Sequence, residues 1–129
     1  MREELDSISG AILDASIAVH RELGPGLLEN AYEACLEYEL NDRGFVVQRQ
    51  KELPVVYRGV TVDCGFRLDL VVNGLVVVEL KAVERLEPIH TAQVLTYLKL
   101  TKLHLGLLIN FNESRLANGF KRLVREFPT

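Results

Sequence analysis

The chain has 129 residues, and its 15 lysines and arginines against 18 aspartates and glutamates give a formal net charge of −3. Hydrophobic residues make up 48% and charged residues 26% of the sequence, which is typical of a globular protein and excludes a disordered chain. The length fits one domain over residues 1–129. The acidic balance argues against a protein that coats nucleic acid, but leaves room for an enzyme that contacts it at a small site.

The cysteine content and the N-terminus indicate the cellular setting. Cys35 and Cys64 are too few for a disulfide framework, which favours a reducing compartment. No apolar run approaches the roughly 20 residues that cross a bilayer, and Met1–Glu4 is acidic where a signal peptide would be basic. We therefore expect a cytoplasmic protein without membrane contact.

The sequence begins with two predicted helices. Apolar residues recur at helical spacing over residues 5–22, and Gly24-Pro25-Gly26 ends that pattern. A second helix is expected from about Leu27 to Arg43, with Gly44 as its C-terminal stop. Each helix has one apolar stripe, so both should pack against a common core.

β-Branched runs predict a group of strands after these helices. The runs cover residues 45–50, 60–72 and 75–80, with 55–57 continuing the first of them after a proline. Asn73-Gly74 indicates a hairpin between the last two runs. The run 75–80 is apolar on both faces, as expected for an interior strand that helices cover on both sides.

Helix and strand patterns alternate in the last third of the chain. We expect a helix over residues 89–98 and an interior strand over 105–109, whereas the tail, 110–129, fits either a helix or a short strand. The element order is α-α-β-β-β-α-β plus a C-terminal tail. This order predicts an α/β fold with a mixed sheet flanked by helices.

Three charged residues interrupt the apolar strands. Glu79 and Lys81 end an interior strand and share a face because side chains alternate, while Asp69 comes from the preceding strand. Two carboxylates beside an ammonium suit a hard divalent cation such as Mg²⁺. The alternative is a charged strand end in which Glu79 and Lys81 form a surface ion pair worth about 0–1 kcal/mol.

The site hypothesis depends on the hairpin register. A strict two-residue loop at Asn73-Gly74 would put Asp69 and Glu79 on opposite faces of the sheet. A three-residue loop, Val72–Gly74, would place Asp69 opposite Val77 and diagonal to Glu79, at about 7–8 Å between backbones. We therefore expect this odd register, or a bulge with the same effect.

The arrangement Asp69…Glu79-x-Lys81 resembles the core motif of the PD-(D/E)XK nuclease superfamily. The wider sequence is similar to a small branch of it, the GxxExxxxR proteins. The similar segments are residues 23–33, 65–71, 78–82 and 88–98. One position departs from the branch pattern, since counting from Gly26 places Ala34 where the pattern has arginine.

The resemblance implies a restriction-endonuclease-like fold and roles for particular residues. Asp69 and Glu79 would hold Mg²⁺, or Mn²⁺ in its place, with the Leu80 carbonyl as a third ligand. Lys81 would orient or deprotonate the attacking water and offset charge on the phosphate. Glu29 matches the helical acid that binds or orients metal in many members; its alternative role is to complement the helix dipole.

Four further residues are candidates near the same cleft. Gln93 and Tyr97 resemble the Gln-x-x-x-Tyr motif of RecB-like nuclease domains, and their spacing puts them on one helix face. They could instead be a solvated glutamine and a core tyrosine. Arg67 shares the Asp69 face and could contact phosphate, although an ion pair with a neighbouring acid is favoured. His90, at a helix start, is the one histidine near the cleft and a candidate for substrate binding.

These expectations define a small Mg²⁺-dependent nuclease that acts on nucleic acid, with DNA expected ahead of RNA. A further possibility is a subunit that works only as a homodimer or beside a DNA-binding partner, because so short a chain has no separate element for reading DNA. The alternative from another class is a non-catalytic binding or assembly module that keeps the nuclease fold. The acidic charge and small size favour that alternative.

Overall fold

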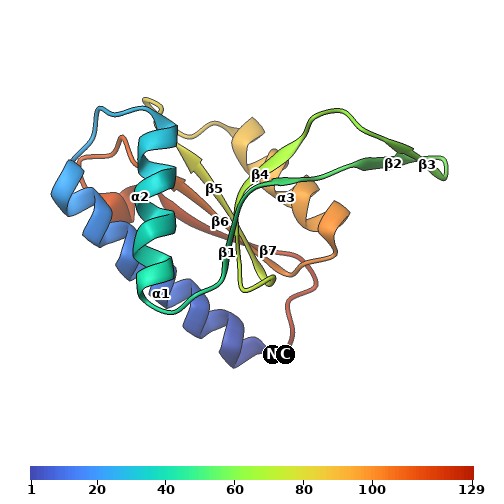
Figure 1. The fold of residues 1–129 in the computed structure, drawn as a ribbon, viewed down its shortest axis with the longest axis horizontal. Coiled ribbons are helices and arrows are strands. Elements are labelled where there is room, and N and C mark those ends of the chain that lie inside the picture. The colour runs from blue at the N-terminus through green and yellow to red at the C-terminus, as the bar shows by residue number, and fades with distance from the viewer.

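A computed structural model describes residues 1–129, and it contains a five-stranded mixed sheet between helices and a separate two-stranded sheet (Figure 1). The elements in chain order are α1 (Arg2–Leu23), α2 (Glu29–Asp42), β1 (Val47–Glu52), β2 (Val55–Tyr57), β3 (Val60–Val62), β4 (Arg67–Val72), β5 (Val76–Lys81), α3 (Pro88–Thr101), β6 (Leu105–Asn110), the 3₁₀ helix η1 (Leu116–Gly119) and β7 (Phe120–Val124). The predicted fold class is confirmed.

Both N-terminal helices form where the apolar periodicity predicts them. At the end of α2, Gly44 has a φ of 91° and donates its N–H to the carbonyl of Asn41. The N–H of Phe45 reaches back to the Leu40 carbonyl at 3.0 Å. These two bonds form a Schellman motif, which requires a residue that adopts positive φ at low cost. Gly44 is therefore the stop that the sequence indicates.

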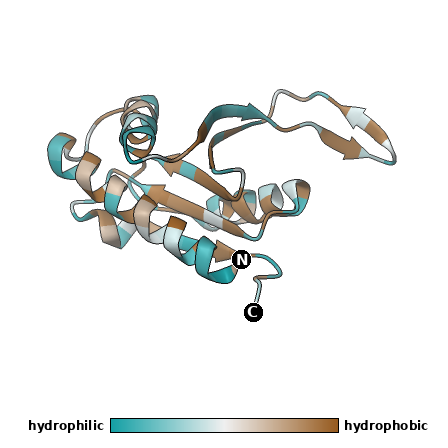
Figure 2. Ribbon diagram, turned by 60° about the horizontal axis from the view of Figure 1, so that its bottom comes forward, coloured by the Kyte–Doolittle hydropathy of each residue, from teal (hydrophilic) through white to brown (hydrophobic).

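The large sheet has the strand order β1-β4-β5-β6-β7 and buries both of its faces. β5 and β6 are parallel, and the other neighbours are antiparallel. On β5, Val76, Val78 and Leu80 belong to the main core with α1 and α2, whereas Val77 packs with Leu98 of α3. The apolar strands lie between these helix layers (Figure 2), as the sequence predicts for a strand covered on both sides.

The β4–β5 hairpin differs in one detail from its prediction. Its three-residue loop is Asn73–Leu75 rather than Val72–Gly74, so that Val71, not Asp69, pairs with Val77. Asn73 and Gly74 both have positive φ, 53° and 66°, as the Asn-Gly signal indicates. The predicted register was therefore wrong by two residues. The predicted number of loop residues, three, is confirmed, and an odd number is what the prediction needed to put Asp69 and Glu79 on one face.

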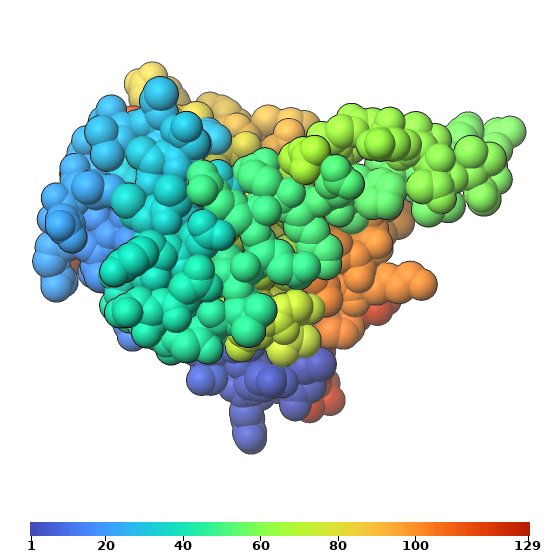
Figure 3. Space-filling view, viewed as in Figure 1, coloured from blue at the N-terminus to red at the C-terminus, as the bar shows by residue number.

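The predicted continuous strand over residues 60–72 is also wrong. It is broken at residues 63–66, and its first part, β3, pairs with β2 in a hairpin outside the main sheet. Arg58 and Gly59 turn this hairpin with φ values of 50° and 79°. The hairpin, which we call the arm (residues 55–62), projects beyond the rest of the molecule (Figure 3).

The tail forms a strand, which settles the alternative that the sequence left open. β7 pairs antiparallel with β6 along its length, from Leu105–Val124 to Ile109–Phe120. After β7, the guanidinium groups of Arg2 and Arg122 lie over the Phe127 ring, at 5.8 and 4.8 Å from its centroid. None of the helices combines the length and the apolar character that crossing a membrane requires.

Candidate active site

The central feature of the site is a fork between β4 and β5. Their ladder ends at the pair Leu70–Val78. Beyond that pair, β4 stays with β1 as far as Arg67, and β5 stays with β6 as far as Lys81. The two strands therefore separate beyond this pair (Figure 1). Asp69 on β4 and Glu79 on β5 are the first residues past the end of the ladder.

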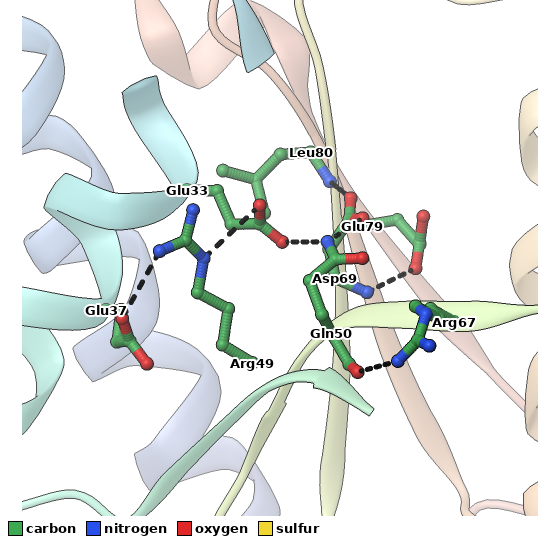
Figure 4. Close-up of polar contacts among 8 residues, drawn as sticks. All are labelled: Glu33, Glu37, Arg49, Gln50, Arg67, Asp69, Glu79 and Leu80. Atoms are coloured by element: carbon green, nitrogen blue, oxygen red, sulfur yellow. Dashed lines mark hydrogen bonds and ion pairs between the residues drawn. The ribbon is translucent and has the colours of Figure 1, made fainter. Parts of the chain in front are cut away.

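The two carboxylates replace the missing ladder bonds at this fork. The N–H of Asp69 donates to Glu79 Oε1 at 3.1 Å, and the N–H of Leu80 donates to Asp69 Oδ2 at 2.9 Å (Figure 4). Extending the register places Asp69 directly opposite Glu79 rather than diagonal to it. The carboxylates thus converge more closely than the predicted diagonal placement, in the space between the two strands.

The position of Glu79 disfavours its ionisation beside Asp69. Glu79 is 5% exposed and Asp69 is half-buried. Burial, and then the negative charge of Asp69, raise the pKa of Glu79 to about 8, while Lys81 acts in the opposite direction. A site that disfavours its own second negative charge favours a cation placed between the acids.

Leu80 and Lys81 take the positions that strand alternation predicts. The Leu80 side chain is buried in the core with α1 and α2, whereas Lys81 is half-buried at the end of β5. The Leu80 N–H points toward Asp69, and in an extended strand the carbonyl of the same residue points to the same side. The Leu80 carbonyl is therefore directed into the fork.

The chain after Lys81 is held by a buried amide. Asn110, the partner of Lys81 on β6, is fully buried. Its side chain accepts from the N–H of Val83 at 3.1 Å and donates to the carbonyl of the same residue at 2.9 Å. This two-way contact fixes the backbone that follows the site.

The donor set at the fork fits a hard cation that keeps part of its water. No group of three or more His, Cys, Asp or Glu residues is arranged to hold a metal ion. Mg²⁺, however, is commonly bound through one or two carboxylates, with water and substrate oxygens completing its shell. Asp69, Glu79 and the Leu80 carbonyl match this requirement, whereas they lack the nitrogen and sulfur donors of a structural zinc site.

The α2 carboxylate that joins this cluster is Glu33. Glu29 is the exposed first residue of α2 and makes no hydrogen bond or ion pair to the fork. Glu33, one turn further, is buried and accepts from Gln50 Nε2 at 2.6 Å and pairs with Arg49 at 3.4 Å. Burial raises the pKa of Glu33, and the charge of Asp69 adds to that effect.

Gln50 links Glu33 to the fork. Its amide also donates to Asp69 Oδ1, at 3.4 Å (Figure 4). Gln50 has a φ of 53°, which is strained for a residue with a side chain. Sequence reasoning missed both residues. For Glu33 a signal existed, because it precedes the buried Leu36 and Leu40 by three and seven residues, on their helix face. For Gln50 the sequence contains no such signal.

Tyr97 lies near the carboxylates, and Gln93 lies beside it. Burial, and then the charges of Glu79 and Asp69, raise the pKa of the Tyr97 hydroxyl. Gln93 and Tyr97 line one pocket together with Phe66, whose ring meets that of Tyr97 edge to face at 6.5 Å. The spacing of these two α3 residues therefore places both at one pocket, whose lining does not include the three charged residues of the fork.

Arg67 and His90 are engaged within the protein. Arg67 pairs with Glu52 at 3.1 Å across β1 and β4, which is the ion pair that the sequence analysis favoured. His90 Nδ1 accepts from the N–H of Glu87 at 2.9 Å and so completes a capping box at the start of α3. The opposite nitrogen of His90 has no partner within the chain.

In a comparison with known families, residues 6–123, which are nearly the whole chain, match a family model described as the PD-(D/E)XK nuclease superfamily. That range includes all three charged residues of the fork. The match does not extend to the GxxExxxxR branch, so this finer part of the resemblance is not confirmed. Searches of curated proteins and of solved structures found no match.

Proposed function

The chain belongs to the PD-(D/E)XK nuclease superfamily, and we propose that it is a nuclease that uses Mg²⁺ or Mn²⁺ to hydrolyse phosphodiester bonds of nucleic acid. Its mixed sheet between helices is consistent with the restriction-endonuclease-like fold of that superfamily. The observation that best supports the proposal is the convergence of Asp69 and Glu79 at the fork, with Lys81 two residues further on the same strand.

In this proposal the cation is held by Asp69, Glu79 and the Leu80 carbonyl, and when bound it supplies Lewis-acid charge for the phosphate. The Lys81 ammonium hydrogen-bonds the attacking water and offsets negative charge as the new P–O bond forms and the ester bond breaks. Gln50 restrains Asp69 by its amide contact. The strained conformation of Gln50 is typical of residues that serve a site.

The remaining predicted residues receive supporting roles. Gln93 and Tyr97 line a pocket on α3 together with Phe66, and we propose that they orient the substrate from there. Arg67, still about half exposed beside Glu52, offers a guanidinium to a phosphate, and the outward nitrogen of His90 offers a second contact. Glu29 shares a helix face with Glu33 and is proposed to act from the outer edge of the cluster.

Incubation of the purified chain with single-stranded and duplex DNA and with RNA tests the proposal directly. We expect cleavage with Mg²⁺ or Mn²⁺ and none with EDTA, with DNA cut faster than RNA. Gel analysis of the products measures the metal requirement and the rates of DNA and RNA cleavage. The absence of cleavage on all substrates with either metal would contradict the nuclease function.

A non-catalytic nuclease-fold module is the second candidate. The net charge of −3 favours it, because little positive charge is available to hold a duplex. Calorimetric titration with Mg²⁺ and Mn²⁺ separates the two, since a module without catalysis has no need to keep metal affinity. Measurable binding of either cation supports the nuclease.

The predicted homodimer finds support in the arm. Tyr57, Val60 and Val62 lie on one face of the hairpin and are 62%, 62% and 42% exposed. Arg58 at the tip lies over the Tyr57 ring at 5.4 Å from its centroid, and neither Arg58 nor Asp63, at the base, has an ion-pair partner within the chain. In a two-fold antiparallel pairing of arms, the tip of each would lie at the base of the other, so the charges are complementary.

Sedimentation velocity tests the dimer. We expect twice the chain mass of 14.5 kDa for the wild-type protein and a monomer for the double substitution Tyr57→Ser with Val60→Ser. Val46→Ser, at a position that is 70% exposed outside the arm, should keep the dimer. A wild-type monomer at micromolar concentration would show that the arm has another use.

A further inference from the structure

A small pocket lies between the entry to β4 and helix α3, beside the fork. Its volume is about 190 Å³, and it is lined by Phe66, Ile89, Ala92, Gln93, Thr96 and Tyr97. Phe66 is 48% exposed and Ile89 is 61% exposed, so an aromatic and an aliphatic side chain both face the solvent here. None of the lining residues carries a formal charge. The pocket therefore suits a flat, uncharged group better than a phosphate.

The position of the pocket indicates what that group belongs to. Phe66 precedes Asp69 by three residues, about 10 Å along an extended strand. Tyr97 forms the other wall and packs against the cluster that contains Leu68, which precedes Asp69, and Val77, which precedes Glu79 by two residues. A phosphate at the fork would thus place a neighbouring part of the same nucleic acid at the pocket.

We propose that this pocket is a nucleobase subsite, in which an unpaired base stacks on Phe66 and meets the Gln93 amide at its edge. The inference rests on the proposed nuclease function and deepens it by naming the substrate class, a single-stranded or frayed end. An aromatic ring stacks on any base, and a glutamine amide both donates and accepts hydrogen bonds. The subsite is therefore tolerant of base identity.

The same geometry disfavours an intact duplex. A paired base reaches such a pocket only after it leaves the stack, which costs a few kcal/mol. Phosphate contacts along a duplex would have to offset this cost, and the chain is acidic overall. An unpaired strand avoids the cost, so it is the substrate that the pocket selects.

Binding of oligonucleotides that contain the fluorescent base 2-aminopurine tests the subsite in metal-free buffer, where no strand is cut. We expect the single strand to bind with quenched fluorescence and at least tenfold tighter than the duplex. Phe66→Ala should weaken single-strand binding roughly 5- to 150-fold and abolish the quench, because stacking is worth about 1–3 kcal/mol per base. Phe66→Tyr should keep both.

Two further variants separate stacking from ordinary apolar contact. Phe66→Leu keeps an apolar side chain against Tyr97 but has no ring, so it should behave like Phe66→Ala. Tyr38→Ala, which removes an aromatic ring that is 74% exposed on α2, should leave binding unchanged. Circular dichroism checks that each variant is folded.

Several outcomes would overturn the subsite. These are equal affinity for duplex and single strand, an unquenched complex, or wild-type binding by Phe66→Ala. If no oligonucleotide binds at all, the subsite is also rejected, and the pocket would then fit a side chain of a partner protein instead. Quenched binding without cleavage after Mg²⁺ or Mn²⁺ is added would keep the subsite and reject the nuclease function, so the two failures are distinguishable.

Discussion

At pH 9, Lys81→Ala is expected to reduce cleavage by at least about 10²-fold without loss of metal binding. Lys81 follows Glu79 by two residues on β5 and lies on the same face of the strand. Its ammonium is positioned to act on the attacking water and on the charge that develops at phosphorus, whereas the cation is held by other groups. Single-turnover cleavage and calorimetric Mg²⁺ titration measure the two effects separately.

Two comparisons make this prediction specific. Lys99→Ala removes an equal charge from an exposed position in the last turn of α3 and should keep wild-type cleavage. Glu79→Gln keeps the size of a proposed metal ligand but removes its charge, so it should lose both cleavage and metal affinity. Cleavage that persists in Lys81→Ala and in Glu79→Gln would place the chemistry elsewhere.

The pH of this assay matters because Lys81 also acts on Glu79. Its positive charge lowers the pKa of Glu79, so its removal should raise that pKa above the wild-type value of about 8. Metal binding by Lys81→Ala should therefore be compared with the wild type at pH 9 as well as at pH 7.5. A cleavage defect that remains at the higher pH belongs to the missing ammonium rather than to a protonated ligand.

The sequence predicted the layers of the fold because its periodicities are strong. Apolar spacing located the helices and the interior strands, and Asn73-Gly74 located the hairpin. The loop position was wrong because Val72–Gly74 and Asn73–Leu75 both contain three residues and put Asp69 and Glu79 on one face. Only packing of the strands distinguishes such registers.

Other parts of the site depend on contacts that a single sequence does not display. Glu29 and Glu33 both lie on the apolar stripe of α2, and the position of β1 decides that Glu33 meets Gln50. The positive φ of Gln50 is set by its surroundings, since nothing in its residue type favours it. The break at residues 63–66, by contrast, had a signal in the sequence, because Asp63 and Gly65 are disfavoured in strands and Gly65 adopts a φ of 72°.

The stability of the metal-free protein is expected to fall as the pH rises from about 4.5 to about 8. Burial and Asp69 raise the pKa of Glu79 from 4.5 to about 8, so within this window the folded chain binds more protons than the unfolded chain. Below the window Glu79 is protonated in both states, whereas within it the unfolded chain ionises this acid and the folded chain keeps the proton, so the unfolded state gains stability. Glu33 adds a contribution of the same sign.

Glu79→Gln should reduce this pH dependence, because the amide stays neutral at every pH. We expect the variant to exceed the wild type by several kcal/mol at pH 8.5 and to match it near pH 4.5. Urea unfolding in EDTA at pH 4.5, 6.5 and 8.5 measures the difference. Glu84→Gln, which neutralises an exposed acid just after β5, should follow the wild-type curve.

Mg²⁺ should reverse the loss of stability at high pH in the wild-type protein but not in Glu79→Gln. The cation binds the deprotonated acids, so it should stabilise the wild type more at pH 8.5 than at pH 5.5 and have little effect on Glu79→Gln. Equal stabilisation of both proteins, or a wild-type stability that rises between pH 4.5 and pH 8, would contradict the assignment of Glu79 as a buried metal ligand. Such a result would mean that the fork is closed by its own hydrogen bonds and that its acids serve the fold rather than a reaction.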